Sequence, residues 1–563
     1  MIYHCEDHTC NYWDEGEKLP ERCPQCGRKL LRANEADMTG DDWTALGNTL
    51  WDAEASDKKR MVDCFRKAAY LGSAWGVCNL GICMEQGNGV EADPVQAFWL
   101  YQQAVEMGSL NAVCCLGVCY QYGIGTAPDA EKAAELYCKA AEYGSPRGQM
   151  LLARAFHDGI GVEADAAEAV HWGRAAAYQR YGEGMYRLGV CYEYGDGVEQ
   201  NWEHAVHWFR EAAESGVSTA MTDLGYCYEK GCGVEQSWEQ AFSWYRRGAE
   251  CGYPVSMSNL GLCYQMGYGV EQNWQEAVKW YEQGAQCGNL QSMNNLAYCY
   301  ERGEGVEQNE DRALYWYRRG AEAGSVHCMF CLGWNYSNGE GVEQNMTEAI
   351  RWYTAAAEGG NADAMHDLGW HYDHGEGVEQ DMKKAIYWYE RAAEQNRPAA
   401  MNSLGECYAM GRGVPRDLET AMEWYRRAAE LGEAMADYNM GWHLEQAGKL
   451  SEAYAHYRKA ADGNDDSAWW ALGRFYENGV VVAQDGKEAR RCYETGEKLG
   501  SVKCKMRLAR CKLLGIGGRR EKKAGLDLCR QALELAKESS EKEDYGYEAE
   551  MNLLRRTIAE NES

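Results

Sequence analysis

Residues 218–253 read STAMTDLGYCYEKGCGVEQSWEQAFSWYRRGAECGY, and this 36-residue pattern recurs along most of the 563-residue chain. The position that Leu224 holds in this copy is taken by Met440 in the copy after the regular ones, and by Leu472 and Leu508 after a shortened copy. Leu46 precedes the first regular copy's leucine, Leu80, by 34 residues. A constant period of this size predicts a solenoid, in which each unit packs only on its neighbours. A leucine followed by Gly or Ala marks each regular copy, at Leu80, Leu116, Leu152, Leu188, Leu224, Leu260, Leu296, Leu332, Leu368 and Leu404.

Each copy contains the pattern of two helices. Ala220, Leu224 and Cys227 stand at helical spacing in the first half, and the glycines at 231 and 233 interrupt them. Three residues after the loop valine comes Asn, Asp or Ser, which are preferred N-cap residues, so we expect a second helix to begin there. The N-cap positions are Asp93, Asp129, Asp165, Asn201, Ser237, Asn273, Asn309, Asn345, Asp381 and Asp417.

The end of the second helix carries a glycine in most copies. Glycine adopts the left-handed conformation that ends many helices, and Asn396, which fills one of these positions, can adopt it too. Arg180 breaks the pattern, so we expect a different bend after that helix. The glycines are Gly108, Gly144, Gly216, Gly252, Gly288, Gly324, Gly360 and Gly432.

A tryptophan followed by Tyr or Phe recurs in the second helix. Adjacent helical residues point about 100° apart, so the two rings cannot share one face. We expect the tyrosine in the core and the tryptophan between units, with its edge near the surface. The tryptophans are Trp208, Trp244, Trp280, Trp316, Trp352, Trp388 and Trp424.

The pattern A-x-x-x-L-G-x-x-Y-x-x-G-x-G-V, followed by A-x-x-W-Y and A-A-E-x-G, resembles the Sel-1-like repeat family, which is related to the tetratricopeptide repeats. The resemblance covers roughly residues 41–515. It implies an all-α, right-handed superhelical solenoid of about 13 helix-turn-helix repeats that serves as a scaffold for protein complexes. We divide the chain into a zinc-ribbon-like module (1–32), a linker (33–40), the solenoid (41–515) and capping helices (516–563).

Four cysteines near the N-terminus have the spacing of a structural zinc site. Cys5 and Cys10 are separated by four residues, and Cys23 and Cys26 lie in the knuckle sequence C-P-Q-C-G. Four thiolates close the tetrahedron around Zn²⁺ and leave no open position for catalysis. His8 is the rival ligand to Cys10. The zinc either folds a segment that is too short for its own core or supports a docking module.

Charge and cysteine content restrict the partners and the compartment. The formal net charge of −30 disfavours nucleic acid and anionic membranes, which require clustered Lys and Arg. No apolar run approaches the length of about 20 residues that spans a bilayer, and no signal peptide is visible. The 25 cysteines indicate reduced thiols. We therefore expect a cytoplasmic protein, and secretion as an effector without a signal peptide remains open.

Two sets of residues are candidates for binding a partner. Three tryptophans follow the N-cap in consecutive copies and could form an exposed patch. Six glutamates of the repeated V-E-Q segment could form an acidic row for a basic or polar polypeptide. The first set is Trp202, Trp238 and Trp274, and the second is Glu199, Glu235, Glu271, Glu307, Glu343 and Glu379.

The function that we predict is a non-enzymatic scaffold that binds a protein or peptide on the solenoid surface. One alternative is a zinc-ribbon regulator associated with nucleic acid, with the solenoid as its effector arm. Another is a hydrolase, because some Sel-1-like proteins are reported to bind or hydrolyse β-lactams. The sequence supplies no nucleophile and base that stand apart from the repeat pattern, so we expect no catalytic residues.

Overall fold

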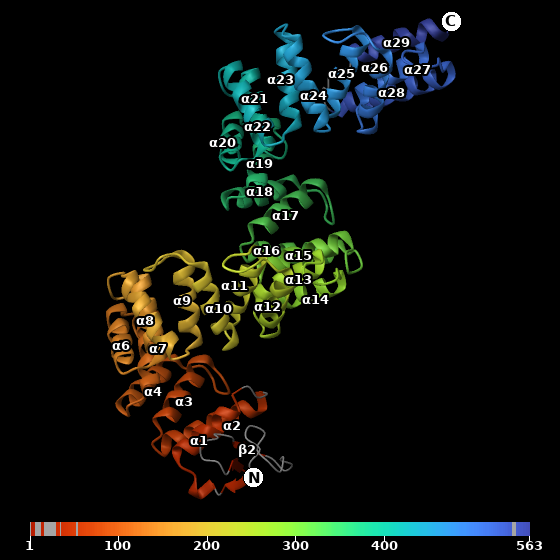
Figure 1. Ribbon diagram of the computed structural model, residues 1–563. Helices are drawn as coiled ribbons and strands as arrows, with labels where there is room; N and C mark the ends of the chain where they lie inside the picture. Colours follow the sequence, from red (N-terminus) through yellow and green to blue (C-terminus); the bar gives the residue numbers. More distant parts are fainter. Residues whose placement is uncertain are drawn as a thin grey trace. The chain divides into compact units, whose positions relative to one another are not determined.

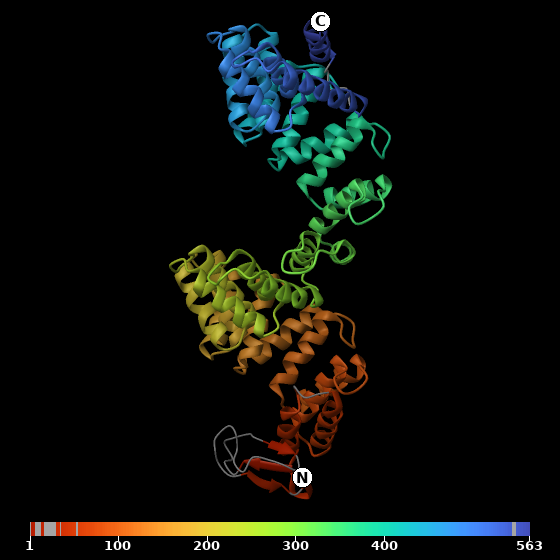
Figure 2. The same ribbon diagram turned by 90° about the vertical axis from the view of Figure 1, so that its right-hand side faces the viewer.

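The computed structural model describes residues 2–5, 13–15, 30–33, 35–51, 55–542 and 548–562. Apart from one small sheet and one 3-10 turn at Glu35–Asp37, the described residues form 29 α-helices. The chain divides into two compact units: unit 1 is Met1–Ser292 with Glu304–Val306, and unit 2 is Met293–Gly303 with Glu307–Ser563. Within each unit, successive helices lie side by side (Figures 1 and 2).

The N-terminal segment contains a three-stranded antiparallel sheet in the order β2-β1-β3. Its strands are β1 (Ile2–Cys5), β2 (Trp13–Glu15) and β3 (Leu30–Ala33). Cys5, the last residue of β1, is paired with Leu30, the first residue of β3. The sheet therefore joins the two ends of the module that the sequence analysis placed at residues 1–32.

The helices that follow in unit 1 have nearly uniform length in the repeats. They are α1 (Gly40–Thr49), α2 (Ala55–Tyr70), α3 (Ala74–Gln86), α4 (Pro94–Glu106), α5 (Leu110–Tyr122), α6 (Ala130–Glu142), α7 (Pro146–Asp158), α8 (Ala166–Tyr178), α9 (Gly182–Tyr194), α10 (Trp202–Glu214), α11 (Ser218–Lys230), α12 (Trp238–Glu250), α13 (Pro254–Met266) and α14 (Trp274–Gln286).

The boundary between the units falls within α15 (Leu290–Arg302). The remaining helices belong to unit 2: α16 (Glu310–Glu322), α17 (Val326–Asn338), α18 (Met346–Glu358), α19 (Ala362–His374), α20 (Met382–Glu394), α21 (Pro398–Met410), α22 (Leu418–Glu430), α23 (Ala434–Gln446), α24 (Leu450–Asp462), α25 (Asp466–Asn478), α26 (Gly486–Lys498), α27 (Val502–Leu514), α28 (Lys522–Lys542) and α29 (Glu548–Glu562).

The helix starts follow the predicted N-caps. All ten predicted residues are N-caps, and the side chain of each accepts a hydrogen bond from the backbone of the first turn, as Asn201 does from the amide of His204 at 3.0 Å. Asp485 caps α26 in the same way. Each such cap contributes about 1 kcal/mol, because a backbone donor at the helix start would otherwise lack a partner.

The helix ends correct one expectation. The glycines that end the second helices have positive φ, and Asn396 joins them at 60°. Arg180 also adopts this conformation, at φ 59°, so the turn after α8 keeps the left-handed geometry of the other repeats. A left-handed residue with a side chain costs about 1–2 kcal/mol. The repeat geometry is therefore stable enough to impose this conformation on arginine.

Most helix pairs are held together by a tyrosine that lies against a glycine. In α12, Tyr245 is buried with 1% exposure, and its ring faces Gly225 of the Leu-Gly pair in α11. A Cβ at Gly225 would lie only 2.6 Å from Cε1 of the ring. The Tyr245 hydroxyl donates a hydrogen bond to Oε2 of Glu229 at 2.8 Å, so the buried phenol is also satisfied.

The expected arrangement of the aromatic pair is confirmed. Tyr245, Tyr281, Tyr353, Tyr389 and Tyr425 are among the largest fully buried side chains. Five of the neighbouring tryptophans are half-buried as expected, whereas Trp244 and Trp388 are buried, with 9% and 8% exposure. The tyrosine is thus the core residue of the pair.

The second glycine of the loop is required for two reasons. Gly233 has φ 68°, and a Cβ there would lie 2.4 Å from the backbone carbonyl of Trp202, which begins the second helix of the preceding repeat. Gly231 has φ 75° as well, but its Cβ would meet nothing closer than Gln236 Cβ at 3.4 Å. Both glycines are therefore required by their positive φ, and only Gly233 is also required by the close approach of the preceding repeat.

We expect Gly233→Ala to lower the free energy of unfolding by about 2–4 kcal/mol, because it adds a steric clash to the strain of positive φ. The matched variant Gly231→Ala should cost only about 1–2 kcal/mol, the strain alone. Urea unfolding followed by circular dichroism measures both. Equal losses for the two variants would contradict the close approach of neighbouring repeats at Gly233.

Candidate partner-binding surface

The predicted zinc ligands are mostly beyond what the structure describes. Cys10, Cys23 and Cys26 lie outside the described residues, and only the backbone of Cys5 is described, at the end of β1. Within the described ranges, no group of three or more His, Cys, Asp or Glu could hold a metal ion. Zinc binding by the four cysteines stays a prediction.

The predicted acidic residues are exposed, and they stand beside a glutamine with a structural role. Gln236 folds back and donates a hydrogen bond from Nε2 to the carbonyl of Glu229 at 2.8 Å, near the end of α11. Gln200, Gln272, Gln308, Gln344 and Gln380 make the same contact in their own repeats. The glutamine thus satisfies a helix-end carbonyl, and the repeated valine is half-buried. The glutamate of V-E-Q is exposed and makes no such contact with a helix end.

These glutamates fall into two groups. Glu199, Glu235 and Glu271 belong to unit 1, and the other three, Glu307, Glu343 and Glu379, belong to unit 2. All six are exposed, and none forms an ion pair with another described residue. Each unit therefore carries three unneutralised carboxylates at its loops, which fit a basic partner.

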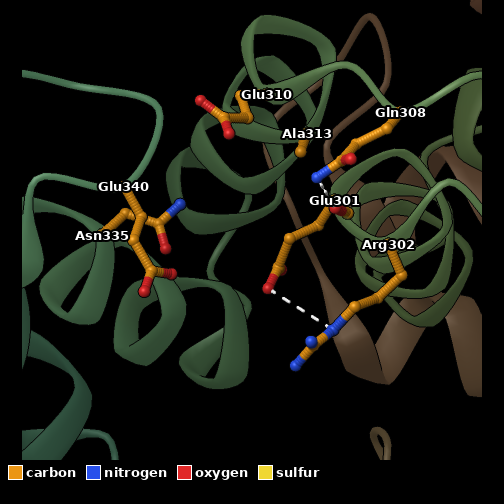
Figure 3. A pocket seen from close by; sticks show the side chains of 7 residues that line it. All are labelled: Glu301, Arg302, Gln308, Glu310, Ala313, Asn335 and Glu340. Atoms are coloured by element: carbon orange, nitrogen blue, oxygen red, sulfur yellow. Dashed lines mark hydrogen bonds and ion pairs between the residues drawn. The ribbon is translucent and has the colours of Figure 1, made fainter.

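An acidic pocket in unit 2 adjoins this loop. Its volume is about 330 Å³, and Figure 3 shows Glu310 and Glu340 with Asn335 on one side and Glu301 with Arg302 on the other. Glu301 accepts a hydrogen bond from the Tyr317 hydroxyl at 2.7 Å. Three carboxylates face one guanidinium here, so the pocket suits a lysine or arginine side chain. Its seven lining residues are Glu301, Arg302, Gln308, Glu310, Ala313, Asn335 and Glu340.

The three predicted tryptophans are half-buried rather than exposed. Trp202, Trp238 and Trp274 each begin a second helix, where their backbone meets the loop of the next repeat. Trp238 stacks on Tyr268 with ring centroids 4.1 Å apart. Their packing between repeats leaves only part of each ring for a partner, and partner binding by this set remains a prediction.

An exposed apolar column on the first helices was missed from the sequence. It occupies the position two residues after the leucine of each Leu-Gly pair, which lies about 200° around the helix from that leucine and so faces solvent. Its sequence signal is an apolar residue that recurs there in most repeats, although the half-buried Trp370 and the charged Glu406 take this position between Trp334 and Trp442. The column comprises Tyr226 and Leu262 in unit 1, 45% and 40% exposed, and Tyr298, Trp334 and Trp442 in unit 2, 39%, 47% and 38% exposed.

Charged side chains accompany these rings. The Lys230 ammonium lies 5.8 Å from the ring centroid of Tyr226, and the Arg302 guanidinium lies 5.9 Å from that of Tyr298. Large aromatic rings at exposed positions are the residues that dominate the energy of protein interfaces. The column is therefore a candidate for a partner-binding face in the described structure.

Helix pairs that repeat with this geometry define an α-solenoid repeat protein. The chain belongs to the Sel1 repeat family, whose model matches 13 segments: residues 76–109, 112–145, 146–181, 182–217, 218–253, 254–289, 290–325, 326–361, 362–396, 398–433, 434–465, 468–501 and 502–537. The last segment takes in α27 and much of α28, so the predicted solenoid end at 515 falls inside a matched repeat. Proteins of this family generally serve as protein-interaction scaffolds, and the fold is typically non-enzymatic.

Two solved structures illustrate the similarity. One is a protective antigen present in uropathogenic Escherichia coli strains, which displays an SLR fold. It is 29% identical to this protein, with a TM-score of 0.57, and the match covers 76% of this chain and 94% of the antigen chain. A Sel1 repeat protein from Oxalobacter formigenes is 32% identical over 43% of this chain and 96% of its own, with a TM-score of 0.40. No curated protein matches the chain. Among the described helices, none is long and apolar enough to cross a membrane.

The exposure of the column predicts a contrast in stability. Trp334→Ser should lower the free energy of unfolding by about 1 kcal/mol or less, because nearly half of the residue is already exposed to water. Trp388→Ser, at a ring that is 8% exposed, should cost about 3–5 kcal/mol. Urea unfolding of both variants measures the difference. A large loss for Trp334→Ser would show that this ring belongs to the core.

Proposed function

We propose that this protein is a non-enzymatic scaffold that binds a basic polypeptide segment on its first helices and adjacent loops. The exposed apolar column of Tyr298, Trp334 and Trp442 carries the proposal. In unit 2 this column is accompanied by the unpaired loop glutamates and by the acidic pocket around Glu301 and Glu310. Apolar anchors would supply most of the affinity, and the carboxylates would select a basic partner.

The net charge of −30 supports the same choice of partner and disfavours nucleic acid. None of the cysteines whose side chains are described forms a disulfide, and most of them are buried. With the cysteine content of the sequence, this supports our proposal that the protein works in the reducing cytoplasm.

Selection of random peptides on the full-length protein tests the proposed binding mode. We expect the selected peptides to be rich in Lys, Arg and apolar residues. The double variant Trp334→Ser/Trp442→Ser should weaken their binding about tenfold or more, because it removes two anchors. The triple variant Glu307→Gln/Glu343→Gln/Glu379→Gln should weaken it less and reduce its dependence on salt.

Tyr70→Ser is the matched control, because Tyr70 is a 91% exposed aromatic residue of α2, outside the column. It should leave binding unchanged. Selected peptides without a basic bias, or binding that is insensitive to both sets of substitutions, would contradict the proposal.

We also propose that Cys5, Cys10, Cys23 and Cys26 hold a structural zinc ion. The pairing of Cys5 with Leu30 supports this, because it brings the first cysteine to the strand that directly follows the C-P-Q-C segment. Four thiolates are the donor set of closed structural zinc sites. When bound, the metal would hold the short sheet together and would not react.

Native mass spectrometry of the full-length protein measures the metal. One zinc ion per chain is expected, and it should be lost in Cys23→Ser/Cys26→Ser. It should be kept in Cys251→Ser, a change at an exposed cysteine of the solenoid, and in His8→Ala, because histidine is the rival ligand to Cys10. Absence of zinc after incubation with the metal would refute the site, and loss of zinc in His8→Ala would replace Cys10 by the histidine.

A further inference from the structure

Two cysteines from neighbouring repeats meet in the core of unit 1. Cys78 of α3 is fully buried and Cys115 of α5 is 5% exposed. The two thiols are hydrogen-bonded to each other, so their sulfur atoms lie in contact. This contact crosses the boundary between two repeats, and a covalent bond formed here would join α3 to α5.

The repeat geometry makes this contact a regular one. The same two positions, 37 residues apart on successive first helices, are joined by side-chain hydrogen bonds in other repeats. The Tyr186 hydroxyl donates to Oδ2 of Asp223 at 2.9 Å. Asn439 donates from Nδ2 to Oδ1 of Asn402 at 3.0 Å. Across the regular copies, two cysteines occupy these positions only once, so the stacking of the repeats itself brings this pair together.

Polar side chains hold both sulfur atoms. Arg147, in the first turn of α7, donates from Nη1 to Sγ of Cys115 at 3.4 Å and to Oδ1 of Asn111 at 2.7 Å. Asn111 donates in turn from Nδ2 to Sγ of Cys78 at 3.6 Å. The pair therefore lies in a short hydrogen-bonded chain with a guanidinium beside one of its sulfur atoms.

These contacts give the two cysteines different protonation states. The hydrogen bond from Cys78 lowers the pKa of the Cys115 thiol, burial opposes this shift, and Arg147 lowers the pKa further. The same hydrogen bond, together with burial, raises the pKa of Cys78. Cys115 is thus the thiolate of the pair and Cys78 is its proton donor. The thiolate is the form of cysteine that reacts with oxidants.

We propose that Cys78 and Cys115 form a redox-active dithiol, which hydrogen peroxide converts into a disulfide between α3 and α5. In the reducing compartment proposed above, the pair would rest as thiols and the disulfide would be transient, as it is in redox-sensing proteins of the cytosol. The site is separate from the exposed column of unit 2 and does not depend on partner binding there.

The reaction needs no other oxidant. The Cys115 thiolate attacks one oxygen of hydrogen peroxide, the O–O bond breaks, hydroxide leaves, and Cys115 becomes a sulfenic acid. The Cys78 sulfur then attacks the Cys115 sulfur, its proton goes to the departing hydroxyl group, and water leaves. The two sulfur atoms lose two electrons, which reduce the peroxide, and they end about 2.05 Å apart. A dithiol reductant reverses the bond by thiol-disulfide exchange.

Disulfide mapping on the full-length protein tests the site. The reduced protein is freed of reductant, treated with hydrogen peroxide, alkylated at its remaining thiols and cleaved after glutamate. This cleavage separates the two cysteines, because Glu85, Glu91 and Glu106 lie between them. We expect a cross-linked peptide whose fragmentation places the bond between Cys78 and Cys115. Dithiothreitol should remove the cross-link.

Single substitutions distinguish the two roles. Cys115→Ser should abolish the cross-link and leave Cys78 as a thiol, whereas Cys78→Ser should stop the reaction at the Cys115 sulfenic acid, which dimedone traps. Cys263→Ala is the matched control, because Cys263 is also buried and burial raises the pKa of its thiol. It should form the cross-link as the unmodified protein does.

Three results would overturn the proposal. The first is that Cys78 and Cys115 stay reduced in peroxide while the exposed Cys251 and Cys287 are oxidised. The second is a disulfide that fragmentation assigns to other cysteines of these helices. The third is a cross-link to Cys78 that persists in Cys115→Ser.

Discussion

The contact between a buried tyrosine and the glycine of the Leu-Gly pair holds most of the repeats together. It brings the two helices of a pair close enough for their alanine and leucine side chains to pack, and the tyrosine hydroxyl reaches a polar side chain at the end of the first helix. Because both partners lie in one repeat, the core is built locally and is extended by stacking. The loop glycine, as at Gly233, then fixes how closely the next repeat approaches.

Local construction leaves much of the surface free to vary. The valine and glutamine of V-E-Q serve packing and helix-end hydrogen bonding, so their recurrence needs no partner to explain it. The glutamate between them and the aromatic residues of the first helices meet water instead. These positions do not hold the repeat together, and this freedom is what suits such a fold to binding other proteins. Gly173 of α8 stands where Tyr137 and Phe209 lie in neighbouring repeats, so even a core position can depart from the pattern.

The sequence alone predicted the solenoid, the helix starts and the buried tyrosines, because all of them follow from the period and from capping chemistry. It did not predict the geometry at Arg180, since the preference of arginine against positive φ is overridden by packing in the rest of the repeat. The sequence also predicted an exposed patch at Trp202 and Trp238, which are half-buried, and missed the exposed Trp334. Burial at the start of a helix depends on how closely the neighbouring loop approaches, and periodicity does not report this.

Hydrogen exchange in Tyr389→Ala most directly tests the claim that each repeat is held by its own tyrosine and stabilised only by its neighbours. Tyr389 is 1% exposed and lies against Gly369 in unit 2, so its loss should cost about 3–5 kcal/mol. The account predicts faster amide exchange in α19 and α20 and in the adjacent α18 and α21, with α27 and α28 unchanged. Equal acceleration in all helices of unit 2 would contradict it.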